Sequence, residues 1–245
     1  KLGIPKDRIF YYGAKKNWWS RSGTPDQMPA GEPGGPDSEV FFEFVQVPHN
    51  LKFGKVCHPN CDCGRFLEIG NSVFMQYQKQ ADGSLRGLPQ KNVDFGGGLE
   101  RLTAATNDNP DIFAIDVYKP VIETIEQVVG KKYAEAAVTI RIVADHMRVA
   151  QALVAEGVMP ANKLQGYVLR RFILRAAVKL RSLKPDMSEG DWAAVCENEV
   201  IVEEIDKFKK TLDKGLKLVG KIAPFDLFQT YGFPPEITEE LLKQQ

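Results

Sequence analysis

The pattern of apolar and polar positions changes part-way along the chain. Up to about residue 105, the apolar residues are mostly aromatic or β-branched, and they occur in short runs separated by Gly, Pro and polar residues. This pattern is typical of β-strands. The runs at 40–45, 66–77 and 92–95 predict strands, and Ala81-Asp82-Gly83-Ser84 predicts a hairpin turn. We therefore expect an antiparallel sheet in this half.

After residue 106, apolar residues recur every three or four positions, which is the period of an amphipathic helix. We expect helices over residues 116–129, 134–156, 166–183 and 188 to about 219. The predicted fold class is α+β, with two domains. Residues 1–106 would hold a sheet with helices, and residues 107–245 would form an all-α domain.

Length and composition are consistent with this division. The 245 residues are 43% hydrophobic, which is enough for a substantial core in one large or two modest domains. There is neither an apolar run of membrane-spanning length nor a signal peptide, so no membrane partner is expected. Four cysteines are too few for a disulfide framework at this length and favour a reducing, cytoplasmic setting.

The charge is balanced overall but uneven locally. With 32 basic and 32 acidic residues, the chain is not coated for nonspecific polyanion binding. Between residues 163 and 184, however, there are seven basic side chains and no acidic one. Arg171, Arg175 and Lys179 recur every four residues, so they predict a row of cations spaced for RNA phosphates. The alternative is a solvated basic face paired with acidic neighbours.

The run Asp94-Phe95-Gly96-Gly97-Gly98-Leu99-Glu100-Arg101 predicts a ligand site. Glycines let a bound molecule lie directly on the main chain. Asp94, at the end of a predicted strand, would face an ammonium or hydroxyl group. Arg101, in the first turn of a predicted helix, would meet a phosphate. The alternative is a glycine turn that merely links strand to helix.

A cluster of thiols indicates a second kind of site. Cys57-His58-Pro59-Asn60-Cys61-Asp62-Cys63 offers enough sulfur and nitrogen for tetrahedral zinc, although its spacing is tighter than that of paired C-x2-C knuckles. A small structural zinc site with Cys57, Cys61, Cys63 and His58 as ligands is one hypothesis. Free thiols in a loop are the alternative.

Several motifs carry a resemblance to a known family. Gly-x-Gly-apolar-x-Arg resembles the third signature motif of class II aminoacyl-tRNA synthetases. The wider run is similar to the alanyl-tRNA synthetase family in order and spacing, through Glu68-Ile69-Gly70-Asn71-Ser72-Val73-Phe74-Met75-Gln76-Tyr77, Asp82-Gly83-Ser84-Leu85, Leu88-Pro89 and Val93-Asp94. Further matches are Val143-Ala144-Asp145-His146, Gly157-Val158-Met159-Pro160-Ala161-Asn162, Gly166-Tyr167-Val168-Leu169-Arg170-Arg171 and Thr230-Tyr231-Gly232-Phe233-Pro234.

The resemblance implies a ligase that first converts alanine and ATP, supplied with Mg²⁺, into alanyl-adenylate. It then transfers the alanyl group to the 3′ end of alanine tRNA. No side-chain nucleophile is required, because the enzyme positions charges. The implied roles are ammonium binding by Asp94, orientation of alanine by Asn71, a size limit from Val73, a wall from Trp19, a floor from Gly96, Gly97 and Gly98, and ATP contacts from Arg101 beside Gly97. Purely structural roles remain open for three of these residues: Asn71 in a turn, Trp19 in the core and Val73 in strand packing.

The helical half would then read the acceptor stem of the tRNA. Asn162 matches a family asparagine near the G·U wobble pair of alanine tRNA, whose free guanine amine needs an acceptor. The family usually has an aspartate where this chain has Gln229, and often an arginine where it has Gln165. The other implied RNA contacts are Asp145, Arg170, Arg171, Arg175 and Lys179.

Two functions stay open at this point. Judged by the resemblance, the first two class II motifs and the editing domain lie outside this sequence, so we expect a ligase fragment that is inactive alone. The alternative is a noncatalytic tRNA-binding module derived from such a ligase.

Overall fold

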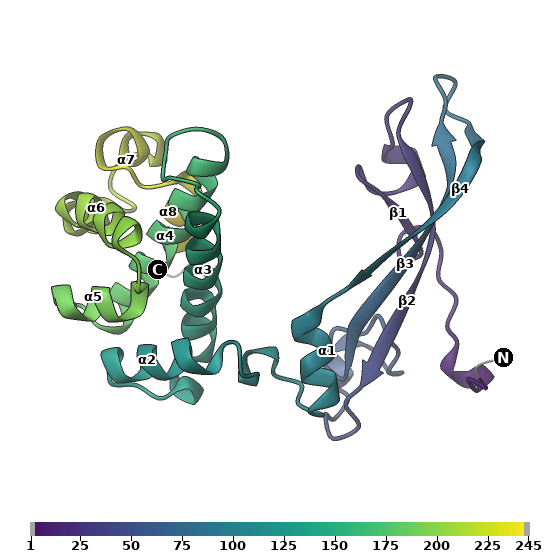
Figure 1. Cartoon of the computed structure of the whole chain (residues 1–245), viewed down its shortest axis with the longest axis horizontal. Coiled ribbons are helices and arrows are strands. Elements are labelled where there is room, and N and C mark those ends of the chain that lie inside the picture. The colour runs from purple at the N-terminus through teal and green to yellow at the C-terminus, as the bar shows by residue number, and fades with distance from the viewer. Residues whose placement is uncertain (1–2, 243–245) are drawn as a thin grey trace. The chain divides into compact units, whose positions relative to one another are not determined.

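The computed structural model describes residues 3–242, with no side-chain description at 210–213, 236 and 240. It divides into two compact units, Lys1–Ile115 and Asp116–Gln245 (Figure 1). Residues 107–115 therefore fall with the sheet unit, whereas the sequence favoured a boundary after residue 106. Among the described residues, no helix is both long enough and apolar enough to span a membrane.

The first unit is built on one antiparallel sheet in the order β1-β2-β3-β4. Its strands are β1 (Trp18–Ser20), β2 (Pro33–Glu43), β3 (Phe66–Lys79) and β4 (Leu85–Gly97). The predicted hairpin turn joins β3 to β4, closed by a 2.8 Å bond from the Gln80 N–H to the Ser84 carbonyl. Figure 1 shows the long strands β2, β3 and β4 twisting together. The predicted α+β class with an antiparallel sheet is confirmed.

Two strand segments were not expected. β1 is only three residues long, and β2 begins at Pro33, inside a Gly- and Pro-rich stretch typical of loops. Gly35 explains why such a stretch belongs in a sheet. A Cβ atom there would lie 1.8 Å from the Phe74 carbonyl oxygen, so only glycine permits this approach of β2 to β3.

Strand register decides which side chains share a face of the sheet. Asn71 of β3 lies opposite Glu39 of β2 and Gly96 of β4, and Val73 lies opposite Asp37 and Asp94. Directly paired residues project from the same face, as do residues two apart on a strand. These six positions therefore form one polar face. The other face is apolar and exposed, with Val40, Phe74, Val93 and Phe95 at 56%, 37%, 64% and 66% exposure.

The three glycines do not form a separate turn. Gly96 and Gly97 continue β4, paired with Asn71 and Gly70, and Gly98 is the N-cap residue of α1 (Leu99–Thr106). The predicted passage from strand into helix is confirmed, and Arg101 lies in the first turn of α1.

The second unit is helical. Its helices are α2 (Lys119–Val129), α3 (Ala137–Ala155), α4 (Leu164–Leu183), α5 (Glu189–Cys196), α6 (Glu199–Leu218), α7 (Pro224–Tyr231) and α8 (Pro235–Leu242). The buried side chains of α3 and α4 include Ile140, Met147, Leu169 and Ile173, each with no exposed surface. A second cluster joins α4 to the last three helices through Leu174, Phe208, Leu227, Phe233 and Ile237.

The expectation of one helix from residue 188 to about 219 is wrong. The chain breaks between α5 and α6, where Glu197 adopts a left-handed conformation with φ of 49°. Asn198 then caps α6 by accepting hydrogen bonds from the N–H groups of Val200 and Ile201. The spacing of apolar residues continues through this break, so the sequence did not reveal it. An Asn can cap a new helix or lie within a longer one, and the spacing does not distinguish the two.

Candidate functional site

A cleft of about 860 Å³ lies over the polar face of the sheet. Its floor comes from β2, β3 and β4, with Val73 buried and Gly96 open above. Apart from Gly96 and its two chain neighbours, no atom of the described residues lies within 4 Å of the position that a Cβ of Gly96 would take, so its backbone is bare toward the cleft. Trp18 and Trp19 of β1 also line the cleft, and Trp18 stacks on Tyr77 with 5.9 Å between ring centroids.

Acidic groups flank β3 on the cleft floor, with Asp37 and Glu39 on β2 and Asp94 on β4. Asp37, Glu39 and Asp94 all line it, and the amide nitrogen of Asn71 donates a 3.1 Å hydrogen bond to Asp37 Oδ2. Burial, with Glu68 and Asp37 nearby, raises the pKa of the Glu39 carboxyl. The buried Asp37 Oδ1 and Asn71 Oδ1 have no hydrogen-bond partner among the described residues. Acceptors of this kind suit a ligand that brings donors, such as an ammonium group.

Five residues predicted from the sequence line the cleft together, namely Trp19, Asn71, Val73, Asp94 and Gly96. Gly97 and Gly98 are not among its lining residues. Sequence reasoning missed Asp37 and Glu39, which β2 brings beside Asn71. The strand expected over residues 40–45 begins earlier in the structure, at Pro33, and this extension carries both carboxylates to the cleft.

Arg101 lies beside the cleft and is held by Glu68, one of the cleft-lining residues. Its Nη1 donates to the backbone carbonyl of Glu68 at 3.2 Å and to the Glu68 carboxylate at 3.1 Å. The arginine side chain is 45% exposed, so its charge remains open to solvent on the other side. A Cβ at Gly98 would lie 3.1 Å from Arg101 Cδ, which leaves this arginine close to the backbone at the start of α1.

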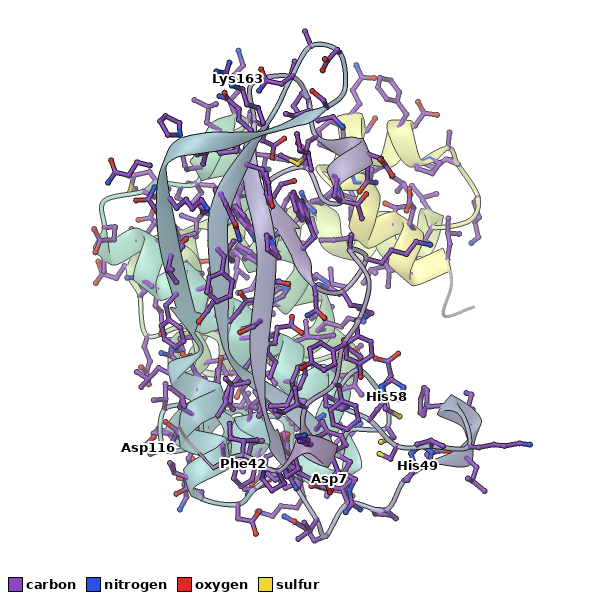
Figure 2. The ribbon with its side chains drawn as sticks, turned by 90° about the vertical axis from the view of Figure 1, so that its right-hand side faces the viewer. Asp7, Phe42, His49, His58, Asp116 and Lys163 are labelled. Carbon is purple, nitrogen blue, oxygen red and sulfur yellow. The ribbon has the colours of Figure 1, made fainter. Side chains whose placement is uncertain are left out.

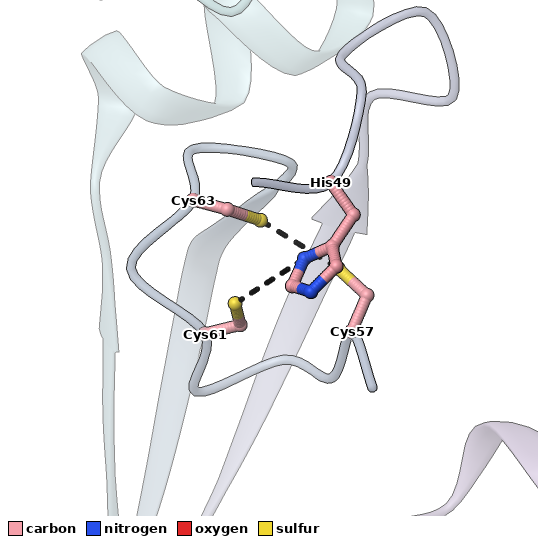
Figure 3. Close-up of side chains that lie close together, drawn as sticks. All are labelled: His49, Cys57, Cys61 and Cys63. Carbon is pink, nitrogen blue, oxygen red and sulfur yellow. Dashed lines mark hydrogen bonds between the residues drawn. The ribbon is translucent and has the colours of Figure 1, made fainter. Parts of the chain in front are cut away.

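The thiol cluster lies in the loop between β2 and β3, and part of that loop forms a further wall of the cleft. The structure brings His49, rather than the expected His58, to Cys57, Cys61 and Cys63 (Figure 3). His58 instead turns to the N-terminal segment, where its Nδ1 lies 3.0 Å from the Tyr12 hydroxyl. Figure 2 shows both histidines close to the sulfur atoms of this loop. The hypothesis that His58 is a ligand is therefore corrected to His49.

The surroundings of the cluster shift the pKa values of two of its thiols in opposite directions. Hydrogen bonds with His49 and the Arg65 N–H lower the pKa of Cys63 to about 6. Desolvation and the neighbouring sulfurs raise the pKa of Cys57 to about 11. A thiolate is the form of cysteine that binds a soft metal ion, so a cluster that lowers the pKa of one thiol is a candidate metal site.

In the helical unit, Arg170 ties together residues that sequence reasoning treated separately. Its Nη1 donates to Asn162 Oδ1 at 2.6 Å, and its Nε donates to Glu204 of α6 at 2.7 Å. Asn162 and Gln229 are both exposed. A Cβ on Gly232, at the end of α7, would lie 3.5 Å from Arg170 Nη2. This arginine therefore fixes Asn162 against α6 near the end of α7.

The predicted row of exposed cations on α4 is only partly present. Lys179 is 7% exposed, so the expectation that it faces solvent is wrong. Arg175 is half-buried and lies 3.2 Å from His146 Nε2, while the Nδ1 of that histidine lies 3.2 Å from Asp145. Arg171 packs over the Tyr167 ring at 5.8 Å. The three basic residues do recur every four positions on α4, but packing against α3 occupies part of the helix face that holds them.

Comparison with known proteins shows where this architecture belongs. The model of the family described as tRNA synthetases class II (A) matches residues 1–245. This chain belongs to the class II tRNA synthetases. The cleft and the arginine at the start of α1 both lie within the matched region.

Individual relatives of this class II synthetase chain carry a common name. It is similar to the alanine–tRNA ligase of Petrotoga mobilis, with 36% identity over 281 residues, 100% of this chain and 31% of the relative. The alanine–tRNA ligase of Treponema denticola is 37% identical over 283 residues, 99% of this chain and 45% of the relative. That of Thermotoga maritima is 34% identical over 279 residues, 100% of this chain and 31% of the relative. The chain spans less than half the length of these relatives.

Proposed function

We propose that this chain is the part of an alanine–tRNA ligase that holds alanine and ATP in its sheet unit and the tRNA acceptor stem in its helical unit. The observation that carries this proposal is the acidic cleft beside Arg101, in a class II chain whose relatives bear that name. We assign residues 1–106, which lie in the sheet unit, to the catalytic domain, and residues 107–245, which contain the helical unit and the 107–115 segment, to tRNA recognition.

The cleft is suited to a small amino acid. Asp94 and Asp37 lie opposite Val73 on the same face, so two carboxylates can meet the substrate ammonium while the valine limits the space for its side chain. Asn71 would orient the substrate, Trp19 would wall it, and the bare backbone at Gly96 would lie against it. One methyl group is worth only about 1–3 kcal/mol of discrimination, so this cleft alone would separate alanine from glycine or serine poorly.

ATP would lie at the end of β4 and the start of α1. In the proposed first step, a carboxylate oxygen of alanine attacks the α-phosphorus of ATP and pyrophosphate leaves, forming alanyl-adenylate. Mg²⁺ accompanies ATP as part of the substrate. Arg101 would exchange its contact with Glu68 for a phosphate oxygen, aided by the N-terminus of α1, with Gly97 and Gly98 leaving room for the approach.

In the helical unit, Asn162 is proposed to read the wobble pair. Its Oδ1 accepts from Arg170, and a carbonyl oxygen has a second lone pair with which it can accept from the free guanine amine. Gln229, an amide where the family usually has a carboxylate, is proposed as the second reader. Asp145, Arg170 and Arg171 are proposed as stem contacts. Arg175 and the buried Lys179 are less suited to that role.

The chain by itself is proposed to form adenylate inefficiently, because the resemblance places the first two class II motifs, including an arginine on the α-phosphate, outside this sequence. The competing proposal is a noncatalytic tRNA-binding module, favoured by Gln229 and Gln165 at positions where the family has charged residues. The intact cleft favours the ligase.

Binding of alanine tests the cleft. Titration calorimetry of the chain with alanine should give heat that Asp94→Asn strongly reduces, because a charge-assisted hydrogen bond is worth about 1.5–3 kcal/mol. Asp26→Asn, an exposed aspartate outside the cleft, is the matched control and should bind like the parent chain. Equal heats for both variants would reject the role of Asp94. Pyrophosphate exchange at a near full-length rate would reject the proposed inactivity of the chain alone.

Binding of RNA tests the helical unit. The chain should bind an alanine acceptor-stem hairpin with G·U more tightly than one with G·C at fixed moderate salt, since only the wobble pair leaves the guanine amine free. Asn162→Ala should remove that preference and keep the nonspecific affinity. Equal binding of both hairpins by the parent chain would mean that this unit supplies phosphate contacts only.

A further inference from the structure

The loop between β2 and β3, residues 44–65, is here named the cysteine loop. It gives the cleft a wall made of Pro59, Asn60, Cys61, Asp62 and Gly64. The loop contains little regular structure, only a short 3-10 turn at Leu51–Phe53. A segment of this kind needs other interactions to hold one shape.

The base of the cysteine loop is closed by β2 and β3. The Phe44 N–H donates to the Arg65 carbonyl at 2.8 Å. The Arg65 guanidinium donates to the Val47 carbonyl at 3.0 Å and to the Glu43 carboxylate at 2.8 Å. These contacts fix the two ends of the loop but leave its centre, which contains the cleft wall, to be held by something else.

The centre contains four potential metal ligands with the separations of a tetrahedral site. The ligand atoms of His49, Cys57, Cys61 and Cys63 all lie within 4.8 Å of one another. The Sγ atoms of Cys57 and Cys63 are 3.6 Å apart, and Cys61 Sγ is 3.7 Å from His49 Nδ1. A zinc ion with Zn–S bonds of about 2.3 Å places its sulfur ligands roughly 3.8 Å apart. The three thiols are free rather than joined in a disulfide.

The imidazole is already turned for coordination. His49 Nε2 lies 2.9 Å from the Gly54 carbonyl, which only accepts, so that nitrogen carries the proton. In neutral His49, the lone pair therefore resides on Nδ1, the nitrogen that faces Cys61. A ring N–H donated to a backbone carbonyl is the usual outer contact of a metal-bound histidine. The Arg65 N–H makes a similar outer contact to the Cys63 sulfur.

We propose that His49, Cys57, Cys61 and Cys63 bind one structural zinc ion, which fixes the cysteine loop as a wall of the cleft. Three thiolates and one imidazole are a closed tetrahedral set, so the ion is structural rather than catalytic. Cys61 is both a ligand and a cleft-lining residue, so the metal acts directly on the wall. That the wall serves substrate binding rests on the proposed function, whereas zinc binding itself does not.

Zinc content tests the site independently of any activity. The chain purified without chelator should contain one zinc ion per molecule by elemental analysis. Cobalt added to the chelator-treated, reduced chain should give the charge-transfer and visible bands of tetrahedral thiolate coordination. His49→Ala and Cys57→Ser should lose this spectrum, whereas His58→Ala and Cys196→Ser should keep it. Absence of zinc, an octahedral cobalt spectrum, or a loss confined to His58→Ala would overturn the proposal.

Thiol counting on the parent chain keeps the test decisive if a variant fails to fold. After chelation, Cys57, Cys61 and Cys63 should all react with a thiol reagent, and added zinc should protect them. Cys196 should stay unreactive in both states, because it is fully buried and burial raises its pKa to about 12. Thiols that remain equally reactive with and without zinc, or a Cys57–Cys63 disulfide in place of the metal, would contradict the site.

Limited trypsin digestion tests the effect on the wall. Lys52 and Lys55 are exposed within the cysteine loop, and Lys163 is exposed before α4 in the other unit. Removing zinc should accelerate cleavage after Lys52 and Lys55 several-fold and leave cleavage after Lys163 unchanged. Bound zinc with unchanged loop cleavage would overturn the proposed effect on the wall, while the zinc analysis would still stand.

Discussion

The side-chain amide of Asn71 donates a 3.1 Å hydrogen bond to the carboxylate of Asp37, a residue on the neighbouring strand. In the strand register, Asn71 pairs with Glu39, so this bond runs diagonally across β2 and β3. It orients a carboxylate whose other oxygen is buried and has no partner among the described residues. The pair therefore sets the position of the Asp37 carboxylate on the cleft floor.

Asn71→Ala should destabilise the sheet unit, because Asp37 then keeps a partly buried charge without its donor. The expected loss is about 1–3 kcal/mol in the free energy of unfolding. Urea denaturation followed by tryptophan fluorescence measures it. Ser72→Ala, on the opposite face of β3, is the control and should shift the midpoint much less. An unchanged midpoint for Asn71→Ala would mean that the hydrogen bond contributes nothing net.

Gly96→Ala should separate binding from folding. The added methyl group meets open space above β4, so the unfolding transition should stay close to that of the parent chain. The same methyl enters the cleft floor and should weaken alanine binding at least several-fold. Gly87→Ala, on the same strand but outside the cleft-lining set, is the matched control and should affect neither property. Calorimetry and thermal unfolding on both variants distinguish the two effects.

Ionised Glu39 should lower the folding stability of the chain and strengthen alanine binding. Its pKa is raised above the ordinary value by burial and by the charges of Glu68 and Asp37. A carboxyl with a raised folded pKa is destabilising when ionised, and this cost disappears as the pH falls through that pKa. Glu39→Gln should therefore raise the melting temperature at neutral pH, and this gain should shrink as the pH falls through the raised pKa of Glu39. It should also weaken alanine binding at neutral pH. A pH-independent gain would argue against ionised Glu39 as the cause.

Arg170→Lys should reduce RNA discrimination more than RNA affinity. Lysine keeps the positive charge but cannot hold Asn162 and Glu204 at once with a planar guanidinium. We expect the preference for the G·U hairpin over the G·C hairpin to fall several-fold, with a similar salt dependence. Arg171→Lys is the matched control on the neighbouring position. An unchanged preference would show that Asn162 does not depend on Arg170 for its position.

Local patterns predicted the elements well where the decisive interactions are short in sequence. Strands β3 and β4, the turn between them and the start of α1 at the glycines follow from alternation and capping within a few residues. The α5–α6 break depends on one left-handed residue, Glu197, which carries no compositional signal. The first part of β2, from Pro33 to Glu39, was not predicted either, because the close approach at Gly35 depends on Phe74 of another strand.

The candidate site shows the same limit. Asp94 and Asn71 were singled out through their motifs, but Asp37 and Glu39 join them only through the pairing of β2 with β3. His58 lies next to Cys57 in the sequence, yet the folded loop selects His49. Lys179 has the right helical period for a surface cation, but the packing of α4 buries it. Sequence spacing gives candidate residues, and long-range packing decides among them.

The apolar face of the sheet, opposite the cleft, has a consequence for handling the protein. Val40, Phe74, Val93 and Phe95 present their side chains to water over three adjacent strands, and β4 pairs only with β3 among the described residues. An exposed apolar surface beside an unpaired strand edge promotes self-association of the chain. The colloidal behaviour of the purified chain should therefore depend on concentration and improve with charged substitutions at Val93 and Phe95, which leave the cleft face untouched.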